Sequence, residues 1–173
     1  MGTFINPDFT ISNLSCNSDV FRTLFSDVSE QEYLWKPPPN KWCLLEIVCH
    51  LYDEEREDFR ARVKHVLENP ELPMASIDPV NWVTKRKYIE RNYSEMIEKF
   101  LEERKQSVVW LKSLKEPKWE NTYNHTQIGT MTAYSFLNNW LAHDYFHFRQ
   151  IVRTKYRYLQ QVTGDKLIYA GEW

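Results

Sequence analysis

Two of the five histidines in the chain, His143 and His147, are four residues apart in the segment HDYFHFRQI. On a helix this spacing places both side chains on one face, where a single metal ion could bind both imidazoles. The same face carries Phe136, Trp140 and Ile151 at steps of three or four residues, so it should face the interior of the fold. Buried imidazoles require either a metal ion or hydrogen-bond partners.

His50 is the candidate for a third ligand. It precedes Leu51 in a second segment with helical hydrophobic spacing, so it should lie at the inner face of that helix or at its edge. Three neutral imidazoles from two helices would leave coordination positions open for water or a substrate, as in catalytic metal sites. The alternative is a buried polar network in which the histidines are hydrogen-bonded to Asp53, Glu54 or Asn139. The spacing is compatible with both interpretations.

Glu54 is the candidate for a catalytic base, or for a hydrogen-bond acceptor from an imidazole, because it follows His50 by one helical turn. It also belongs to the charged run at residues 53–58, which reads Asp-Glu-Glu-Arg-Glu-Asp. Such a run is typical of a solvated helix face, and this is the interpretation that we favour for Glu54.

Two further residues lie close to the histidine pair in the sequence. Gln150 follows His147 by three residues and could either orient that ring or form an ordinary hydrogen bond between helices. Asp144 is rotated by about 100° from His143 on a helix, so it should face a neighbouring helix or solvent instead of a metal ion.

The composition excludes several classes of protein. The 173 residues are 42% hydrophobic and 15% aromatic with a net charge of -2, which indicates one globular domain at residues 1–173 and argues against a nucleic-acid partner. No glycine occurs between residues 3 and 128, which argues against glycine-rich phosphate loops in that stretch and against the Gly-x-Ser-x-Gly elbow. The three cysteines are irregularly spaced, so we expect them to be reduced and mostly buried. Without a leader or an apolar run of membrane length, we expect a soluble, cytoplasmic protein.

Prolines divide the chain into long segments, because a proline ends a helix. Hydrophobic spacing between them predicts four amphipathic helices, at about 7–29, 43–69, 92–114 and 130–164. Residues 70–87 form the connection long enough to cross an end of a bundle. The predicted fold class is therefore all-α, a single four-helix bundle. A ferritin-like di-iron centre is excluded, because the paired Glu-x-x-His strings that it needs are absent.

The sequence resembles the DinB-like (YfiT-like) metalloenzyme family over nearly its whole length. The resemblance is carried by WKPPPNKWCLLEIVCHLYDEE at residues 35–55 and by His-x-x-x-His followed by Gln-Ile at residues 143–151. It implies an up-down-down-up four-helix bundle with one divalent metal ion, zinc, nickel or iron, bound by three histidines. Here those ligands would be His50, His143 and His147. Cys43 departs from the pattern, since relatives usually carry Ser or Thr there, and this concerns the helix cap and not the ligands.

The resemblance also suggests a function. Characterised relatives depend on thiols and include S-transferases that use bacillithiol and isomerases that use mycothiol. It therefore implies an enzyme in which the metal activates a low-molecular-weight thiol or a water molecule for transfer to, or hydrolysis of, a small-molecule substrate. The alternative is a non-catalytic metal-binding or scaffold bundle, one induced by stress or DNA damage. The likeness further predicts a homodimer.

Overall fold

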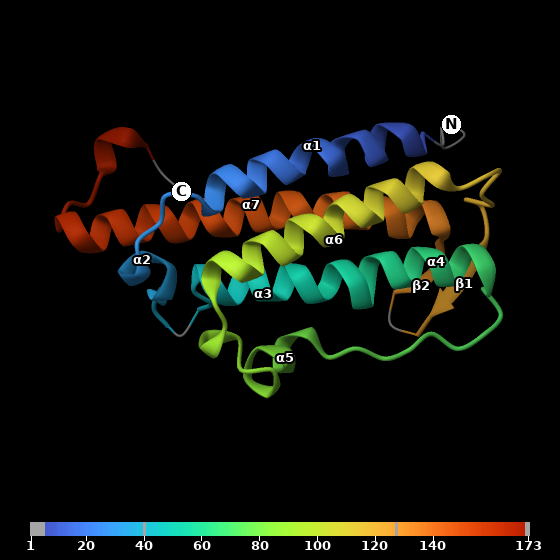
Figure 1. The fold of residues 1–173 in the computed structure, drawn as a ribbon, viewed down its shortest axis with the longest axis horizontal. Helices are drawn as coiled ribbons and strands as arrows, with labels where there is room; N and C mark the ends of the chain where they lie inside the picture. The colour runs from blue at the N-terminus through green and yellow to red at the C-terminus, as the bar shows by residue number, and fades with distance from the viewer. Residues whose placement is uncertain (1–5, 40, 127, 172–173) are drawn as a thin grey trace.

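The computed structural model describes residues 6–39, 41–126 and 128–171, and four long helical segments dominate it (Figure 1). These segments are α1 (Pro7–Phe25), the run of α3 (Leu44–Glu54), η1 (Glu55–Phe59) and α4 (Arg60–Glu68), then α6 (Tyr93–Ser113) and α7 (Ala133–Thr163). The shorter elements are α2 (Glu30–Leu34), α5 (Pro79–Lys85), η2 (Tyr88–Glu90), β1 (Thr122–His125), β2 (Gly129–Thr132) and η3 (Ile168–Ala170). The predicted four-helix bundle is confirmed.

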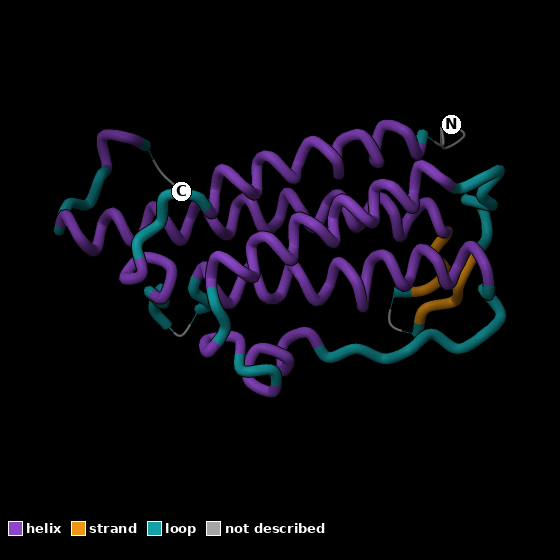
Figure 2. The backbone as a smooth tube through the Cα atoms, viewed as in Figure 1, coloured by secondary structure: helices purple, strands orange, loops and turns teal. Residues whose placement is uncertain are grey.

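The order of the four segments is up-down-down-up. In Figure 1, α1 and α7 run in one direction, whereas the α3–α4 segment and α6 run in the other. Because α4 and α6 are parallel, the chain between them must return along the bundle, and Figure 2 shows this connection as a long loop that leads into short helical turns. We predicted a loop at residues 70–87, but α5 forms within it, where Pro79 occupies the first helical turn.

Polar side chains cap the long helices at the positions that the sequence indicates. The side chains of Asn6, Asn92 and Thr132 each accept a hydrogen bond from a backbone N–H in the first turn of α1, α6 and α7. The first helix ends at Phe25, earlier than predicted, because Ser29 caps the separate short helix α2. The caps therefore fix where each helix begins, and the short helix α2 begins just after the predicted end of the first helix at about residue 29.

A two-stranded hairpin joins α6 to α7 at one end of the bundle (Figure 2). Strand β1 pairs antiparallel with β2, and Thr122 lies opposite Thr132. His125 ends β1 opposite Gly129. Gly129 has a φ of +80°, a conformation that side chains with a Cβ rarely adopt. The hairpin is an addition to the predicted all-α fold.

The buried interior consists of two apolar clusters with a polar layer between them. The first cluster includes Phe21, Leu51, Phe100 and Ile151. The second includes Leu14, Val63, Val108 and Trp140. On each long helical segment a buried polar residue lies between the two clusters in sequence; these residues are Asn17, Glu55, Arg104 and Asp144. Among the described residues, no helix combines the length and apolar character needed to cross a bilayer.

Candidate metal centre

The three histidines singled out from the sequence meet between α3 and α7. His50 lies on α3, and His143 and His147 lie one turn apart on α7. One ring nitrogen of each histidine lies within 4.8 Å of the others. The Nε2 atoms of His143 and His147 are 2.9 Å apart, and the His50 ring centroid lies 5.0 Å from that of His147. The bundle therefore gathers donors that are about ninety residues apart in sequence.

Glu54 lies beside this cluster. Its Oε2 atom is 2.8 Å from Nε2 of His143 and 3.5 Å from Nε2 of His50, and its side chain is only 8% exposed. Burial by itself raises the pKa of this carboxyl, but the hydrogen bond with His143 and the attraction of His50 outweigh it, so the pKa lies below its usual value. Glu54 is therefore an ionised acceptor at the edge of the histidine cluster.

The prediction that residues 53–58 form a solvated surface run is wrong. Asp53, Glu54 and Glu55 are all buried. These carboxylates can be buried because cations from distant parts of the chain pair with them. Arg86 contacts Asp53 at 2.7 Å, and Arg104 contacts Glu55 at 2.9 Å. These partners come from the connection after α4 and from α6, so local charge pattern did not indicate them.

The helix changes its winding within the same run. Residues Glu55–Phe59 form a π-helical turn between α3 and α4. A π turn adds a residue to the helix and shifts the phase of the side chains that follow. Phe59 then packs against His143, with ring centroids 4.7 Å apart and ring planes inclined by 47°. Hydrophobic spacing gave no signal for this turn, and Phe59 was not among the predicted site residues.

The electrostatic environment keeps the buried imidazoles neutral. Burial lowers the pKa of His50 to about 4, although the negative charge of Glu54 opposes the shift. Burial and the neighbouring His143 and His50 rings hold the pKa of His147 well below its ordinary value. A neutral imidazole is the form that binds a metal ion, so at neutral pH both groups are ready to act as ligands.

The hydrogen bonds in the cluster leave some atoms without partners. Nε2 of His143 lies within hydrogen-bond distance both of Nε2 of His147 and of Oε2 of Glu54, yet a neutral ring carries a single N–H to share. The Nδ1 atoms of His50 and His147 are buried, and neither has a hydrogen-bond partner among the described residues. A protein-only network is therefore incompletely satisfied at this point.

A divalent metal ion fits this donor set. Two nitrogens bound to one tetrahedral zinc ion lie about 3.4 Å apart, since each bond is about 2.0–2.1 Å long. The separation of 2.9 Å between the two α7 nitrogens lies below this value, and the limit of 4.8 Å for the whole set lies above it. Small side-chain rotations would bring all three nitrogens to bonding distance, and nitrogen-rich sites of this kind suit zinc, nickel or iron.

The candidate centre opens into a cavity of about 420 Å³. Trp42 forms part of its wall and packs on His50, with ring centroids 4.7 Å apart. Phe146 and Gln150 also line it. Oε1 of Gln150 is buried without a hydrogen-bond partner among the described residues, and its side chain acts to raise the pKa of His147. Gln150 thus lies close to the His147 ring, and its role in orienting that ring stays a prediction.

The alternative interpretation of the histidines was a buried polar network in which they are hydrogen-bonded to Asp53, Glu54 or Asn139. The structure places only one of these three partners at the rings. Of the three partners proposed, Glu54 contacts the rings, but Asp53 accepts a hydrogen bond from Tyr88 at 2.6 Å. Asn139 donates instead to the backbone oxygen of Ser135. Most of the polar side chains expected to satisfy the imidazoles are therefore engaged elsewhere.

Asp144 turns away from the histidines, as its position on the helix predicts. It is fully buried and accepts hydrogen bonds from Arg104 on α6 and from Asn17 on α1. His65 also lies outside the cluster, where its Nε2 atom is 2.8 Å from the backbone oxygen of Leu72. Neither residue contributes a donor to the candidate centre.

The family follows from the sequence match. The model of the DinB superfamily matches residues 14–151, which is most of the chain. The chain belongs to the DinB superfamily. As a DinB protein it carries the family's fold, and its three-histidine cluster lies within the matched region. A comparison with curated protein sequences found no match.

The fold of this DinB protein is also found in a solved structure. It is similar to YfiT from Bacillus subtilis, described as "a probable metal-dependent hydrolase with an unusual four-helix bundle topology". The match has a TM-score of 0.78 and covers 91% of this chain and 90% of that chain, at 15% sequence identity. At this identity the likeness shows the shared fold. The homodimer and the cytoplasmic location expected for this DinB protein stay predictions.

Proposed function

We propose that this protein is a metal-dependent enzyme that transfers a group of a small electrophilic substrate to water or to a low-molecular-weight thiol. The observation that carries the proposal is the convergence of three histidine nitrogens beside the ionised Glu54, with His50 and His147 buried and all three histidines lining an open cavity. The likeness to a bundle described as a probable metal-dependent hydrolase supports it, with hydrolysis as the simplest reaction.

His50, His143 and His147 would hold the metal ion. When bound, a divalent metal supplies a Lewis acid and lowers the pKa of a coordinated water or thiol toward neutrality. Three protein ligands would leave at least one coordination position for water or a substrate, as in catalytic and not in closed structural sites. The neutral state of the buried imidazoles is the state that this role requires.

Glu54 would take up the proton released from the attacking water or thiol at its Oε2 atom. That atom lies 2.8 Å from Nε2 of His143, so the carboxylate is within reach of a group bound beside the histidine nitrogens. Trp42 and Phe146 line the approach and would limit bulk water around the reacting group. Gln150 would hold the His147 ring.

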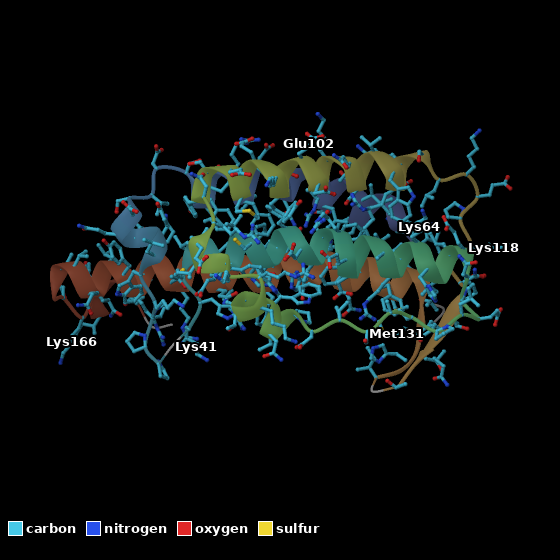
Figure 3. All side chains as sticks on the ribbon, turned by 60° about the horizontal axis from the view of Figure 1, so that its bottom comes forward. Lys41, Lys64, Glu102, Lys118, Met131 and Lys166 are labelled. Atoms are coloured by element: carbon cyan, nitrogen blue, oxygen red, sulfur yellow. The ribbon has the colours of Figure 1, made fainter. Side chains whose placement is uncertain are left out.

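The test compares metal-loaded wild type with Glu54→Gln, and with Glu102→Gln as a control on the exposed face of α6 (Figure 3). Hydrolysis is followed with 4-nitrophenyl acetate, and thiol transfer with cysteine and 1-chloro-2,4-dinitrobenzene. We expect one acceptor to support turnover above that of the free metal ion. Glu54→Gln should retain metal but lose about 100-fold or more in kcat/KM, whereas Glu102→Gln should match wild type.

Two results would count against this function. If metal-loaded wild type shows no turnover with either acceptor, the non-catalytic scaffold is the better description. If Glu54→Gln, shown by metal analysis to be loaded, turns over as fast as wild type, the base is not Glu54.

A further inference from the structure

A second cavity adjoins the candidate metal centre along α7. It has a volume of about 360 Å³ and is formed between the proline-rich segment before α3 and the C-terminal half of α7. It shares four lining residues with the cavity over the histidines, namely Lys41, Trp42, Phe146 and Gln150. The two cavities therefore form one elongated groove with the histidines at one end.

The far part of this groove is lined by cations. Lys41, Arg149, Arg153 and Arg157 all line it, and we call these four residues the cationic groove. Its described lining contains no Asp or Glu. Figure 3 shows Lys41 beside the C-terminal half of α7. The chain has a net charge of -2, so this local excess of positive charge is opposite in sign to the charge of the whole protein.

These arginines differ from most others in the molecule. Arg22, Arg56, Arg60, Arg62, Arg86 and Arg104 each form an ion pair with an Asp or a Glu. Within the described part of the chain, no ion pair is found for Arg149, Arg153 or Arg157. Arg149 lies over the Phe146 ring at 5.2 Å, and Arg157 donates to the backbone oxygen of Pro38 at 3.5 Å. Their guanidinium groups thus keep donors for a ligand.

The spacing of these residues sets the reach of the groove. Arg149, Arg153 and Arg157 are four residues apart, so their side chains follow one side of α7. At about 1.5 Å per residue, Arg153 lies about 9 Å along the helix axis from His147, and Arg157 about 15 Å. Trp42 and Phe146 line both cavities, where they offer an apolar surface. The groove therefore combines the arginines, the apolar surface of Trp42 and Phe146, and the histidines that would bind the metal ion.

We propose that the cationic groove binds the carboxylate or phosphate end of an elongated small-molecule substrate whose reacting group lies at the three histidines. Only the placement of the reacting group at the histidines rests on the proposed function, and the binding of the anion does not. A guanidinium group pairs with either anion through two parallel hydrogen bonds, so the shared chemistry is an oxyanion. The combined cavity is of the size that small-molecule ligands occupy.

The groove is tested first without metal chemistry. Binding of inorganic phosphate and of succinate is measured by calorimetry at low salt, on metal-free protein carrying His147→Leu, so that neither anion can bind through a metal ion. We expect at least one of the two to bind. Adding Arg153→Gln should weaken that binding about tenfold, because an ion-paired hydrogen bond is lost. Adding Lys64→Gln, an exposed charge at the other end of the bundle (Figure 3), should change it less than twofold.

The second measurement uses metal-loaded protein with histidines intact. An aryl ester that carries a distal carboxylate is compared with its methyl-ester isostere. We expect wild type to prefer the charged substrate in kcat/KM, and Arg153→Gln to lose about tenfold on that substrate with little change on the neutral one. The relative affinity of phosphate and succinate indicates which anion the natural substrate carries.

The outcomes separate the two proposals. If neither anion binds the metal-free protein, or if Arg153→Gln and Lys64→Gln weaken binding equally, the cationic groove is not an anion site, whatever the activity of the metal-loaded enzyme. If anion binding depends on Arg153 but no acceptor supports turnover, the groove stands as a ligand site and the proposed reaction fails.

Discussion

Two buried polar clusters lie side by side in this bundle, and they are built from neighbouring residues. Glu54 and His143 face the histidine cluster, whereas the next residues, Glu55 and Asp144, face a buried cluster around Arg104. Consecutive residues on a helix are rotated by about 100°, so adjacent positions on the same two helices serve different clusters. The two clusters differ in how far their polar groups are satisfied within the protein.

The cluster around Arg104 is fully satisfied. Arg104 donates to Glu55 at 2.9 Å and to both carboxylate oxygens of Asp144 at 2.7 Å. Asn17 donates to Asp144, and the indole of Trp140 donates to the second oxygen of Glu55. Every polar group named here has its partner within the protein, so the cluster has no free position for a ligand.

The histidine cluster has the opposite character. Its ring nitrogens converge on one point and carry too few protons to satisfy one another, and two Nδ1 atoms are buried without partners in the described structure. It also opens to a cavity, which the Arg104 cluster does not line. A saturated cluster holds four helices together, and an unsaturated one can accept a ligand.

The largest effect should come from breaking the saturated cluster. Arg104→Met removes the central cation and leaves Glu55 and Asp144 buried without their charged partner. Removing one partner of a buried ion pair typically costs about 3–5 kcal/mol. We therefore expect the free energy of unfolding, measured by urea denaturation, to fall by about that amount. Arg91→Met on the exposed connection is the control and should stay within about 0.5 kcal/mol of wild type. An equally small loss for Arg104→Met would show that this cluster does not stabilise the bundle.

A smaller effect should follow from acidifying the metal-free protein. The pKa of His50 is about 4 in the folded state, below the ordinary value of 6.5, so the unfolded chain binds its proton first as the pH falls. Stability is thus fully present above pH 6.5 and declines between pH 6.5 and pH 4, by about 3 kcal/mol for this group. Urea denaturation across this range measures the slope.

The matched variant for that experiment is His50→Leu. It removes the His50 ring and should make the decline between pH 6.5 and pH 4 less steep by the His50 contribution, while the contribution of His147 stays. Its effect on stability at pH 7.5 should be much smaller than that of Arg104→Met. A decline as steep as in wild type would mean that His50 is not the group whose protonation destabilises the fold.

The helices and the histidine cluster were predictable because both depend on short-range spacing. The capping residues Asn92 and Thr132 mark helix starts, and the four-residue step from His143 to His147 defines a shared helix face. The prediction that His50 lies next to this face depended on the arrangement of the helices in the bundle, which the family resemblance supplied. The structure has this order (Figure 1).

The rest depended on contacts between segments far apart in sequence. The charged run at residues 53–58 has the local pattern of a solvated surface, and its burial depends on Arg86 and Arg104, whose proximity no local pattern reveals. The π turn that brings Phe59 against His143 also lacks a signal in hydrophobic spacing. By contrast, the step of four between Arg149, Arg153 and Arg157 is visible in the sequence, although only the fold shows that it faces a groove.

The central claim is that the unsaturated cluster is a metal site, and metal content tests it most directly. Untagged wild type, His147→Leu and His65→Ala are purified in parallel, incubated with zinc, nickel or iron, desalted, and analysed by mass spectrometry. The account predicts about one divalent ion per chain in wild type and in His65→Ala, and less than about a tenth of that in His147→Leu, with all three proteins folded. Wild type that stays empty with every metal, or His147→Leu that binds as much as wild type, would contradict it.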